Sequence, residues 1–485
     1  MNIKSEKMPG KKKILIATSA LLIDRMLIYS TFADRIKNEA DVTIWAASKA
    51  NNSTASVWDQ VDLKVEAYPH VVPYKIFPYT YMRRLNEAIW DNKQKIPGRL
   101  TMNKFNTKRD GRFSKKVVNV TGKILSYLNI HNFTERFVER VIINNHSRSP
   151  EAAKRLLELN PDVVLITSPI WWVDPAVVVE AKRLGIPVLT MIPSWDNLST
   201  KARLLYRYDG FLLWSGELER QLLEYYPYTR NVPIYKTGAP QFDVFFKEEF
   251  FITKEEFCSH YGLDPSKPII LYALGSPGFF KEDDGAVEFA KRVENNEMGD
   301  IQVIVRPHPV HNNSLLSSKF AGFKSKIVVQ ETANNSIQSE QRSMEVWQVK
   351  EWVNTFRHID LVIQLSSTVS IDASFFDKPV INVAFDPEIG QPNKETLDDI
   401  NHKWVHFKPI FESGAIRNVN NYDEMVEWVN IYLANPSLDS ENRKNILTFV
   451  CGYIDGHCGE RVAEAIFTFL NSQEEIKSKK RHIKV

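Results

Sequence analysis

Short apolar runs, bounded by turn residues and separated by helical patterns, recur along the chain. They lie at 13–18, 41–46, 162–167, 187–192 and 210–214 in the first half, and at 269–274, 301–306, 361–365 and 380–383 in the second. Such runs between helices are typical of parallel sheets that are covered by helices. Two sets with a break near 237–243 predict an α/β fold of two doubly wound, Rossmann-like domains facing a cleft.

The same pattern divides the chain into two domains and a closing segment. A single hydrophobic core rarely holds 485 residues, so the length also favours two domains. We expect a first domain at 1–237, a second at 238–454, and a closing helix with a polar tail at 455–485. The lysine-rich stretch from residue 471 is interpreted as a frayed tail.

An insertion at about 68–149 interrupts the first domain, because the alternation of apolar runs and helices is lost there. Basic residues far outnumber acidic ones between Arg83 and Lys116, and aromatic residues lie among them. Basic and aromatic side chains together suit an anionic acceptor or an acidic membrane surface. A solvated variable loop is the alternative, because runs of charge are often only solvated.

The overall composition is that of a globular protein. Hydrophobic residues make up 43% and charged residues 25%, and 62 basic against 59 acidic residues give a net charge of +3. This even balance argues against a nucleic-acid-binding protein.

Cysteine usage and hydropathy indicate a cytoplasmic protein. The three cysteines, Cys258, Cys451 and Cys458, have no metal-ligand spacing, and their odd number fits a reducing compartment. Asp24 and Arg25 end the apolar run at 14–23 too early for a signal peptide. No stretch approaches the roughly 20 apolar residues of a membrane-spanning helix, so membrane contact would be peripheral, at the inner face.

The run at 301–306 ends in Arg306-Pro307-His308-Pro309. Ligand-binding groups of open α/β sheets gather beyond the carboxyl ends of the strands, where Arg306 and His308 would emerge. A guanidinium suits phosphate, and a histidine donates a hydrogen bond or transfers a proton near neutral pH. The alternative is a rigid turn with a solvent-facing histidine.

A second candidate element follows the run at 361–365. Ser366, Ser367 and Thr368 come directly before a helical pattern, so the helix is expected to begin among them. Free backbone N–H groups and the positive end of the helix dipole would then bind a diphosphate. Plain N-capping without a ligand is the alternative.

A third element, Gly275-Ser276, ends the first strand of the second domain. Glycine allows close approach of the backbone to a ligand, so both residues are candidate donor contacts. A simple loop would use the same residues.

In the first domain, Ser194-Trp195-Asp196-Asn197 follows a strand and should face the cleft. Asp196 is a candidate general base for an acceptor hydroxyl, and Asn197 and Lys201 are candidates for positioning substrate or charge. An Asx-type turn that leads into a helix would also use this Asp and Asn.

Several strings, taken in order, resemble one family. They are Trp214-Ser215-Gly216-Glu217, Gly238-Ala239-Pro240-Gln241-Phe242-Asp243, Arg306-Pro307-His308-Pro309, Ser366-Ser367-Thr368 with Lys378-Pro379-Val380-Ile381, and Asp455-Gly456 with Glu460-Arg461-Val462-Ala463. They resemble GT-B-fold transferases related to the CDP-glycerol glycerophosphotransferases and to surface and capsular polysaccharide glycosyltransferases. The resemblance spans about 162–466 and does not extend securely over 68–149.

The resemblance implies a transferase that uses a nucleotide-activated donor without a metal ion or other cofactor. The nucleotide would lie in the second domain and the acceptor against the first. At matching positions, Arg306, His308, Ser366, Ser367 and Asp372 would be donor-side groups. The Trp195-Asp196-Asn197 string resembles surface-polysaccharide transferases and would be acceptor-side.

One departure from the family concerns the transferred group. The glycerophosphotransferases typically carry a further histidine in a first-domain motif where this chain has Ser194-Trp195-Asp196-Asn197. We therefore predict transfer of a sugar from a nucleotide sugar to a carbohydrate or lipid-linked acceptor, with Asp196 and His308 catalytic. The alternatives are glycerophosphate transfer from CDP-glycerol, epimerisation of a nucleotide sugar, and a non-catalytic scaffold of polysaccharide assembly.

Overall fold

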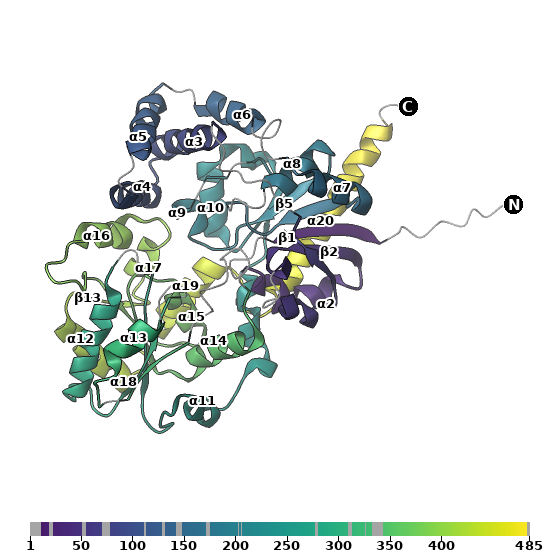
Figure 1. Ribbon diagram of the computed structural model, residues 1–485. Coiled ribbons are helices and arrows are strands. Elements are labelled where there is room, and N and C mark those ends of the chain that lie inside the picture. Colours follow the sequence, from purple (N-terminus) through teal and green to yellow (C-terminus); the bar gives the residue numbers. More distant parts are fainter. Residues whose placement is uncertain are drawn as a thin grey trace.

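The computed structural model shows two α/β halves with an added group of helices (Figure 1). It describes residues 11–18, 23–50, 55–69, 78–110, 113–128, 131–141, 148–170, 175–201, 203–204, 206–276, 280–308, 313–324, 326–331 and 343–482. In that part of the chain, no helix is both long enough and apolar enough to cross a membrane.

Each half is built on a parallel sheet. The first contains β1 (Lys12–Thr18), β2 (Ala40–Ala46), β3 (Lys64–Ala67), β4 (Val163–Ile166), β5 (Val188–Met191), β6 (Gly210–Leu213) and β7 (Ile234–Lys236), in the order β3-β2-β1-β4-β5-β6-β7. The second contains β8 (Ile269–Ala273), β9 (Gln302–Arg306), β10 (Ile327–Val329), β11 (Leu361–Gln364), β12 (Val380–Val383) and β13 (Arg417–Val419), in the order β10-β9-β8-β11-β12-β13. Every apolar run of the sequence forms one of these strands, which confirms the prediction of two doubly wound domains.

The strands that the apolar pattern missed are β3, β7, β10 and β13, the outermost strands of the two sheets. Their side chains are mostly half-buried or exposed, whereas the central strands β4, β5, β11 and β12 are buried throughout. An edge strand is short and covered less completely, so its sequence lacks a continuous apolar run.

Helices cover both sheets. In the first half they are α1 (Arg25–Ile28), α2 (Phe32–Ile36), α7 (Pro150–Leu159), α8 (Pro175–Arg183), α9 (Asn197–Thr200) and α10 (Gly216–Tyr225). In the second they are α11 (Lys254–Tyr261), α12 (Glu282–Glu294), α13 (Asn313–Phe320), α14 (Val346–His358), α15 (Val369–Phe375), α16 (Lys394–Lys403), α17 (Lys408–Glu412), α18 (Tyr422–Ala434) and α19 (Ser440–Cys451).

The insertion is helical, with α3 (Tyr79–Gln94), α4 (Pro97–Asp110), α5 (Phe113–Ser126) and α6 (His131–Val141). Two of its basic residues form ion pairs within the insertion: Arg83 pairs with Glu87 at 3.0 Å, and buried Arg99 pairs with Asp91 at 2.8 Å. The basic composition therefore reflects, in part, ion pairs that hold the insertion together.

Helix α4 connects the two halves of the molecule (Figure 1). A Cβ at Gly98 would lie 2.8 Å from the Ser199 carbonyl oxygen, so α4 packs closely on α9 of the first half. On its other side, Thr101 Oγ1 donates to Asp399 Oδ2 of α16 at 3.1 Å. The insertion thus covers one end of the region between the halves.

The closing segment is a single helix, α20 (Cys458–His482), which returns to the first half and packs on α2 and β6. The stretch after residue 471 is therefore helical as far as His482, and the prediction of a frayed tail is wrong there. Asp243 holds the start of α20, since its carboxylate accepts the N–H groups of Cys458 and Gly459 at 3.0 and 2.8 Å. The family-like strings at 238–243 and 455–463 meet here.

Candidate functional site

Among the cavities that the described residues form between the halves, two are lined by predicted site residues. The first, of about 190 Å³, is lined by Ile23, Arg25, Pro193, Ser194, Trp195, Asn197, Trp214, Gln241, Phe242, Thr368, Ile371 and Asp372. The second, of about 180 Å³, is lined by Met102, Asp196, Thr200, Lys201, Phe280, Glu282, Leu365, Ser366, Ile400 and Trp404. Both are bounded by the two turns that the sequence pattern singled out, at 194–197 and 366–368.

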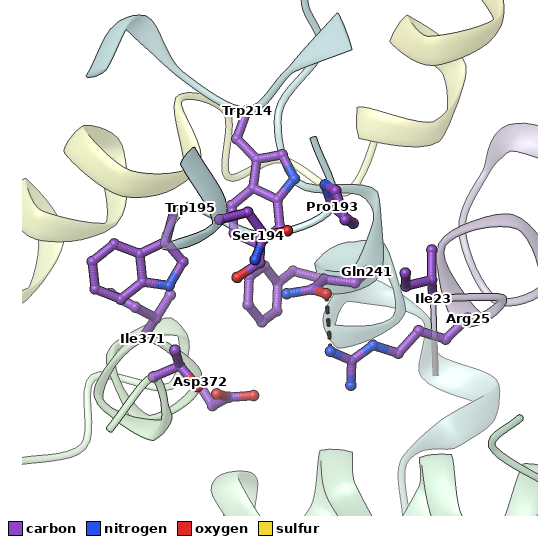
Figure 2. Close-up of a pocket in the computed structure, with 12 residues that line it drawn as sticks. Ile23, Arg25, Pro193, Ser194, Trp195, Trp214, Gln241, Ile371 and Asp372 are labelled. Carbon is purple, nitrogen blue, oxygen red and sulfur yellow. Dashed lines mark hydrogen bonds between the residues drawn. The ribbon is translucent and has the colours of Figure 1, made fainter. Parts of the chain in front are cut away.

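Arg25 begins α1, shortly after β1, and points into the first cavity (Figure 2). Its Nη2 donates to Gln241 Oε1 at 2.9 Å, and its guanidinium lies 4.7 Å from the centre of the Trp352 ring. The Nε atom is buried without a hydrogen-bond partner among the described residues. Burial lowers the pKa of Arg25 to about 10; nearby Arg306 adds to this shift, and Asp372 opposes it.

Asp372 lies on α15, at the opposite wall of this cavity (Figure 2). Its Oδ1 accepts the indole N–H of Trp352 at 2.7 Å. Burial raises the pKa of Asp372 to about 6, although Arg25, the Trp352 hydrogen bond and Arg306 oppose the shift. The second domain thus brings a carboxyl group and a guanidinium close to Arg25 of the first.

Arg306 is the last residue of β9, as the sequence pattern predicted. Its Nη1 is buried without a hydrogen-bond partner in the described part of the chain, and its guanidinium lies 5.7 Å from the Phe356 ring centre. His308, two residues later, is partly buried, and Pro309 lies outside the described residues. Neither Arg306 nor His308 is among the residues that line the two cavities.

Helix α15 begins at Val369 with Thr368 as its N-cap, in agreement with the prediction. Thr368 lines the first cavity and Ser366 the second. Ser366 has a φ of 45°, in the left-handed region that L-residues rarely adopt. Its hydroxyl donates to Asn401 Oδ1 at 2.7 Å, which fixes the turn.

The backbone amides of Ser366 and Ser367 are not free. The N–H of Ser366 donates to Asn382 Oδ1 at 2.8 Å, and the N–H of Ser367 donates to the side-chain oxygen of Gln364. The expectation that these amides face a ligand is therefore not met. Buried polar side chains from β11 and β12 use the donors instead, because an unsatisfied buried donor is costly.

Asp196 precedes α9 and lines the second cavity. Its carboxylate interacts with Ser194 Oγ at 2.6 Å, Asn197 Nδ2 at 2.9 Å, Thr200 Oγ1 at 3.2 Å and Lys201 Nζ at 3.4 Å. Burial alone would raise the pKa of Asp196, but Lys201, His406 and the hydrogen bonds outweigh it and lower the pKa to about 2. Asp196 is held as an ionised carboxylate whose lone pairs are largely engaged.

Trp195 and Asn197 face the first cavity, on the other side of the same turn. The buried Trp195 ring meets His406 of the second half edge to face, with 5.0 Å between ring centres. His406 Nδ1 also lies 3.2 Å from Ser199 Oγ, and burial lowers the pKa of His406 to about 4. A neutral histidine thus joins the turn at 194–197 to the second domain.

Gly275 lies close to the first residue of α12. Its N–H donates to Glu282 Oε2 at 2.9 Å, and a Cβ at this position would lie 2.5 Å from Glu282 Oε1. The backbone donor that was expected to contact a ligand is therefore used by Glu282. Ser276, the other candidate in this loop, is partly buried.

The sequence pattern missed Arg25, Gln241, Glu282 and His406. In the sequence, Arg25 only marks the end of an apolar run, and Gln241 lies in a family-like string without an assigned role. Glu282 and His406 carried no local signal, because each reaches the site only through packing of distant segments.

The adjacent aspartates Asp283 and Asp284 both pair with Lys319, at 2.6 and 2.8 Å. Among the residues that the structure describes, no three His, Cys, Asp or Glu side chains are grouped closely enough to hold a metal ion.

Comparison with known proteins identifies relatives of the chain. Residues 179–468, more than half of the chain, match the family model described as CDP-Glycerol:Poly(glycerophosphate) glycerophosphotransferase. No curated protein sequence is similar enough to the chain to count as a match.

Solved structures show the same fold over nearly the whole chain. An S. aureus MnaA–UDP structure has a TM-score of 0.53 at 13% identity, with 95% of this chain and 97% of that chain covered. A putative UDP-N-acetylglucosamine 2-epimerase from Listeria monocytogenes has a TM-score of 0.54 at 13% identity, with 96% and 98% covered. The two facing Rossmann-like domains are thus of the GT-B type.

Proposed function

The chain belongs to the CDP-glycerol:poly(glycerophosphate) glycerophosphotransferase family, and we propose that it is a transferase that uses a nucleotide-activated donor. We propose further that the group it moves is a sugar and that the acceptor is a surface carbohydrate or a related molecule. The observation that carries this proposal is the proximity of two guanidinium groups between the halves: Arg25 in the wall of the first cavity, and Arg306 near it at the end of β9. Each has a hydrogen-bond donor without a partner among the described residues. An anionic diphosphate would supply the missing acceptors.

The proposed reaction needs no bound metal ion. The acceptor hydroxyl attacks the anomeric carbon, and the bond to the diphosphate oxygen breaks. Arg25 and Arg306 stabilise the departing charge from positions set before the reaction begins. His308, which follows the end of β9, is a further group on the donor side. The acceptor side consists of Trp195, Asn197 and Lys201.

Glycerol phosphate is the second candidate for the transferred group, and the family match supports it. A sugar is favoured because this chain has Ser194-Trp195-Asp196-Asn197 at the first-domain turn where the glycerophosphotransferases typically carry a further histidine. The products differ: sugar transfer from a nucleoside diphosphate sugar releases a nucleoside diphosphate, whereas attack on the β-phosphorus of CDP-glycerol releases CMP.

The test is a donor panel. Thermal-shift measurements with UDP, CDP, GDP, CMP and their sugars, and with CDP-glycerol, should identify a donor, because a ligand of the native state raises its apparent stability. Turnover of that donor with a carbohydrate acceptor should release the nucleoside diphosphate. Release of CMP from CDP-glycerol would replace the sugar by glycerol phosphate, and no stabilisation by any compound would refute the donor site.

The two remaining alternatives predict other outcomes. An epimerase, the activity named for the Listeria structure, would alter the free nucleotide sugar without an acceptor. A scaffold would keep full function in cells after His308→Ala and Asp196→Ala.

We further propose that the insertion contacts an anionic membrane surface through α5 and α6. Large apolar side chains are exposed there: Val120 and Ile124 at 59%, Tyr127 at 78%, Phe133 at 72% and Phe137 at 49%. Lys116 and Lys123 are exposed on α5, and Arg136 and Arg140 on α6. Apolar residues bordered by cations are typical of helices that lie in a membrane interface.

Sedimentation with vesicles tests the membrane contact. The protein should bind phosphatidylglycerol vesicles more tightly than phosphatidylcholine vesicles, and Ile124→Ser with Phe133→Ser should weaken binding. Equal sedimentation of the native and doubly substituted proteins would contradict this assignment.

A further inference from the structure

The buried carboxyl group of Glu282 lines the second cavity. It is the first residue of α12, and its exposed fraction is only 5%. Among the described residues, the only hydrogen bond found for its side chain is the one from the Gly275 N–H, at 2.9 Å. Much of the hydrogen-bonding capacity of the carboxyl group is therefore left for a ligand in the cavity.

The surroundings of Glu282 keep it out of water. Phe280, Leu365, Ile400 and Trp404 line the same cavity, and Met102 of the insertion helix α4 contributes to its wall. Burial raises the pKa of Glu282 to about 8, with a further contribution from Asp283; the Gly275 hydrogen bond opposes the shift. A carboxyl group in such surroundings is a much stronger base, once ionised, than an exposed one.

The other carboxyl group of this cavity has the opposite character. Asp196 belongs to the first domain, interacts with Ser194, Asn197, Thr200 and Lys201, and has a pKa lowered to about 2. Two carboxyl groups whose pKa values are pushed apart within one site are typical of a divided acid–base function. Asp196 is suited to anchoring a hydroxyl or a charge, and Glu282 to exchanging a proton.

We propose that Glu282 is the residue that accepts the proton of the acceptor hydroxyl, while the Asp196–Lys201 pair across the cavity positions the acceptor. This assignment rests on the proposed transferase function. In the step, the acceptor oxygen forms a bond to the donor's reacting atom and the bond to the leaving phosphate oxygen breaks. The proton of the acceptor hydroxyl passes to a carboxylate oxygen of Glu282, so no further reactant is required.

The test compares Glu282→Gln with Glu288→Gln, a substitution on the same helix whose native side chain is 36% exposed and pairs with Lys291. We expect kcat with the identified donor and acceptor to fall at least 100-fold in Glu282→Gln, which is the lower end for loss of a general base. Affinity for the donor, measured by calorimetry, should stay within about threefold in both variants. Glu288→Gln should retain the native kcat.

The pH profile separates a proton acceptor from a merely structural residue. In the native protein kcat should rise as the pH passes through the pKa of Glu282, and this rise should be absent in Glu282→Gln. The titratable groups near Glu282 are Asp196 and Lys201, which line the same cavity, Tyr272 on β8 and Asp283 on its own helix, so Asp196→Asn is examined in parallel. Asp196→Asn should raise KM for the acceptor and keep the rise with pH.

A second variant, Gly275→Ala, tests the same assignment in case Glu282→Gln does not fold. Gly275→Ala would place a Cβ 2.5 Å from Glu282 Oε1 and displace the carboxyl group without removing it, so kcat should also fall. A native kcat in Glu282→Gln, or loss of the pH-dependent rise in Asp196→Asn alone, would overturn the assignment. Failure of the native protein to bind or turn over any donor would instead refute the proposed transferase function on which it rests.

Discussion

At the residue scale, the first cavity depends on side chains that are far apart in the sequence. Arg25 and Gln241 meet through a 2.9 Å hydrogen bond, and Asp372 approaches from the other half. A guanidinium buried in this way is costly unless it has acceptors. Among the described residues, the acceptors found for Arg25 are Gln241 Oε1 and the weak acceptor Met344 Sδ, at 3.7 Å, and its Nε has none, so an anionic ligand would complete its hydrogen bonding.

Arg25→Ala should weaken binding of the nucleotide donor about 10- to 100-fold, the loss expected for one or two charge-assisted hydrogen bonds. Arg25→Lys should restore the charge but only part of the affinity, because an ammonium cannot present the planar fork of a guanidinium. Calorimetric titration measures both. The control is Arg35→Ala on α2, whose side chain pairs with Glu39, and it should bind the donor as the native protein does. Equal affinities for Arg25→Ala and the native protein would remove Arg25 from the donor site.

His406 should make stability depend on pH. Burial lowers its pKa from 6.5 to about 4, so the unfolded chain binds a proton in this interval that the folded protein does not. The contribution of His406 to the free energy of unfolding is about 3 kcal/mol. It is complete above pH 6.5 and is lost as the pH falls toward 4. Urea unfolding from pH 7 to pH 4 should therefore show a steeper loss in the native protein than in His406→Gln. Parallel curves would contradict a buried neutral histidine.

At the element scale, Asp243 couples helices from distant parts of the chain. Besides the first N–H groups of α20, it accepts the hydroxyl of Thr31, next to α2, at 2.9 Å. A carboxylate at a helix N-terminus is stabilised by both hydrogen bonding and the helix dipole. The string at 238–243 therefore has a structural role in addition to its position between the domains.

Asp243→Asn should lower the free energy of unfolding by about 2–3 kcal/mol, because the amide removes the charge and leaves one oxygen acceptor for several donors. Chemical denaturation measures the loss. Asp300→Asn is the matched control: Asp300 is 75% exposed and pairs with Lys267, so its replacement should cost under about 0.5 kcal/mol. Similar losses in the two variants would contradict the anchoring role.

At the scale of the whole molecule, α20, which follows the second domain in the sequence, packs on the first domain. Helix α20 packs on α2 and β6, and its Phe469 is fully buried. A Cβ at Gly210 of β6 would lie 3.6 Å from the Phe469 ring, which shows how closely the helix approaches the sheet. The first domain is therefore completed by residues beyond the second.

Phe469→Ala should destabilise the first domain by about 3–5 kcal/mol, the usual cost of removing a buried phenylalanine ring. Hydrogen exchange should show faster exchange in β6 and α20, with β12 of the second sheet less affected. Ile476→Ala, on the same helix at a position that is 46% exposed, should change little. Faster exchange confined to the second sheet would contradict the assignment of α20 to the first domain.

The sequence by itself determined the two parallel sheets, the strand end at Arg306, the helix start after Thr368 and the cleft-facing turn at 194–197. These depend on local patterns, because a buried strand needs a continuous apolar run and a helix start favours hydroxyl residues. Only the tertiary structure decided that α4 bridges the halves, that side chains of β11 and β12 occupy the amides of Ser366 and Ser367, and that Arg25 and Glu282 line the cavities. Burial and charge at these positions come from segments that are distant in sequence, so no local pattern encodes them.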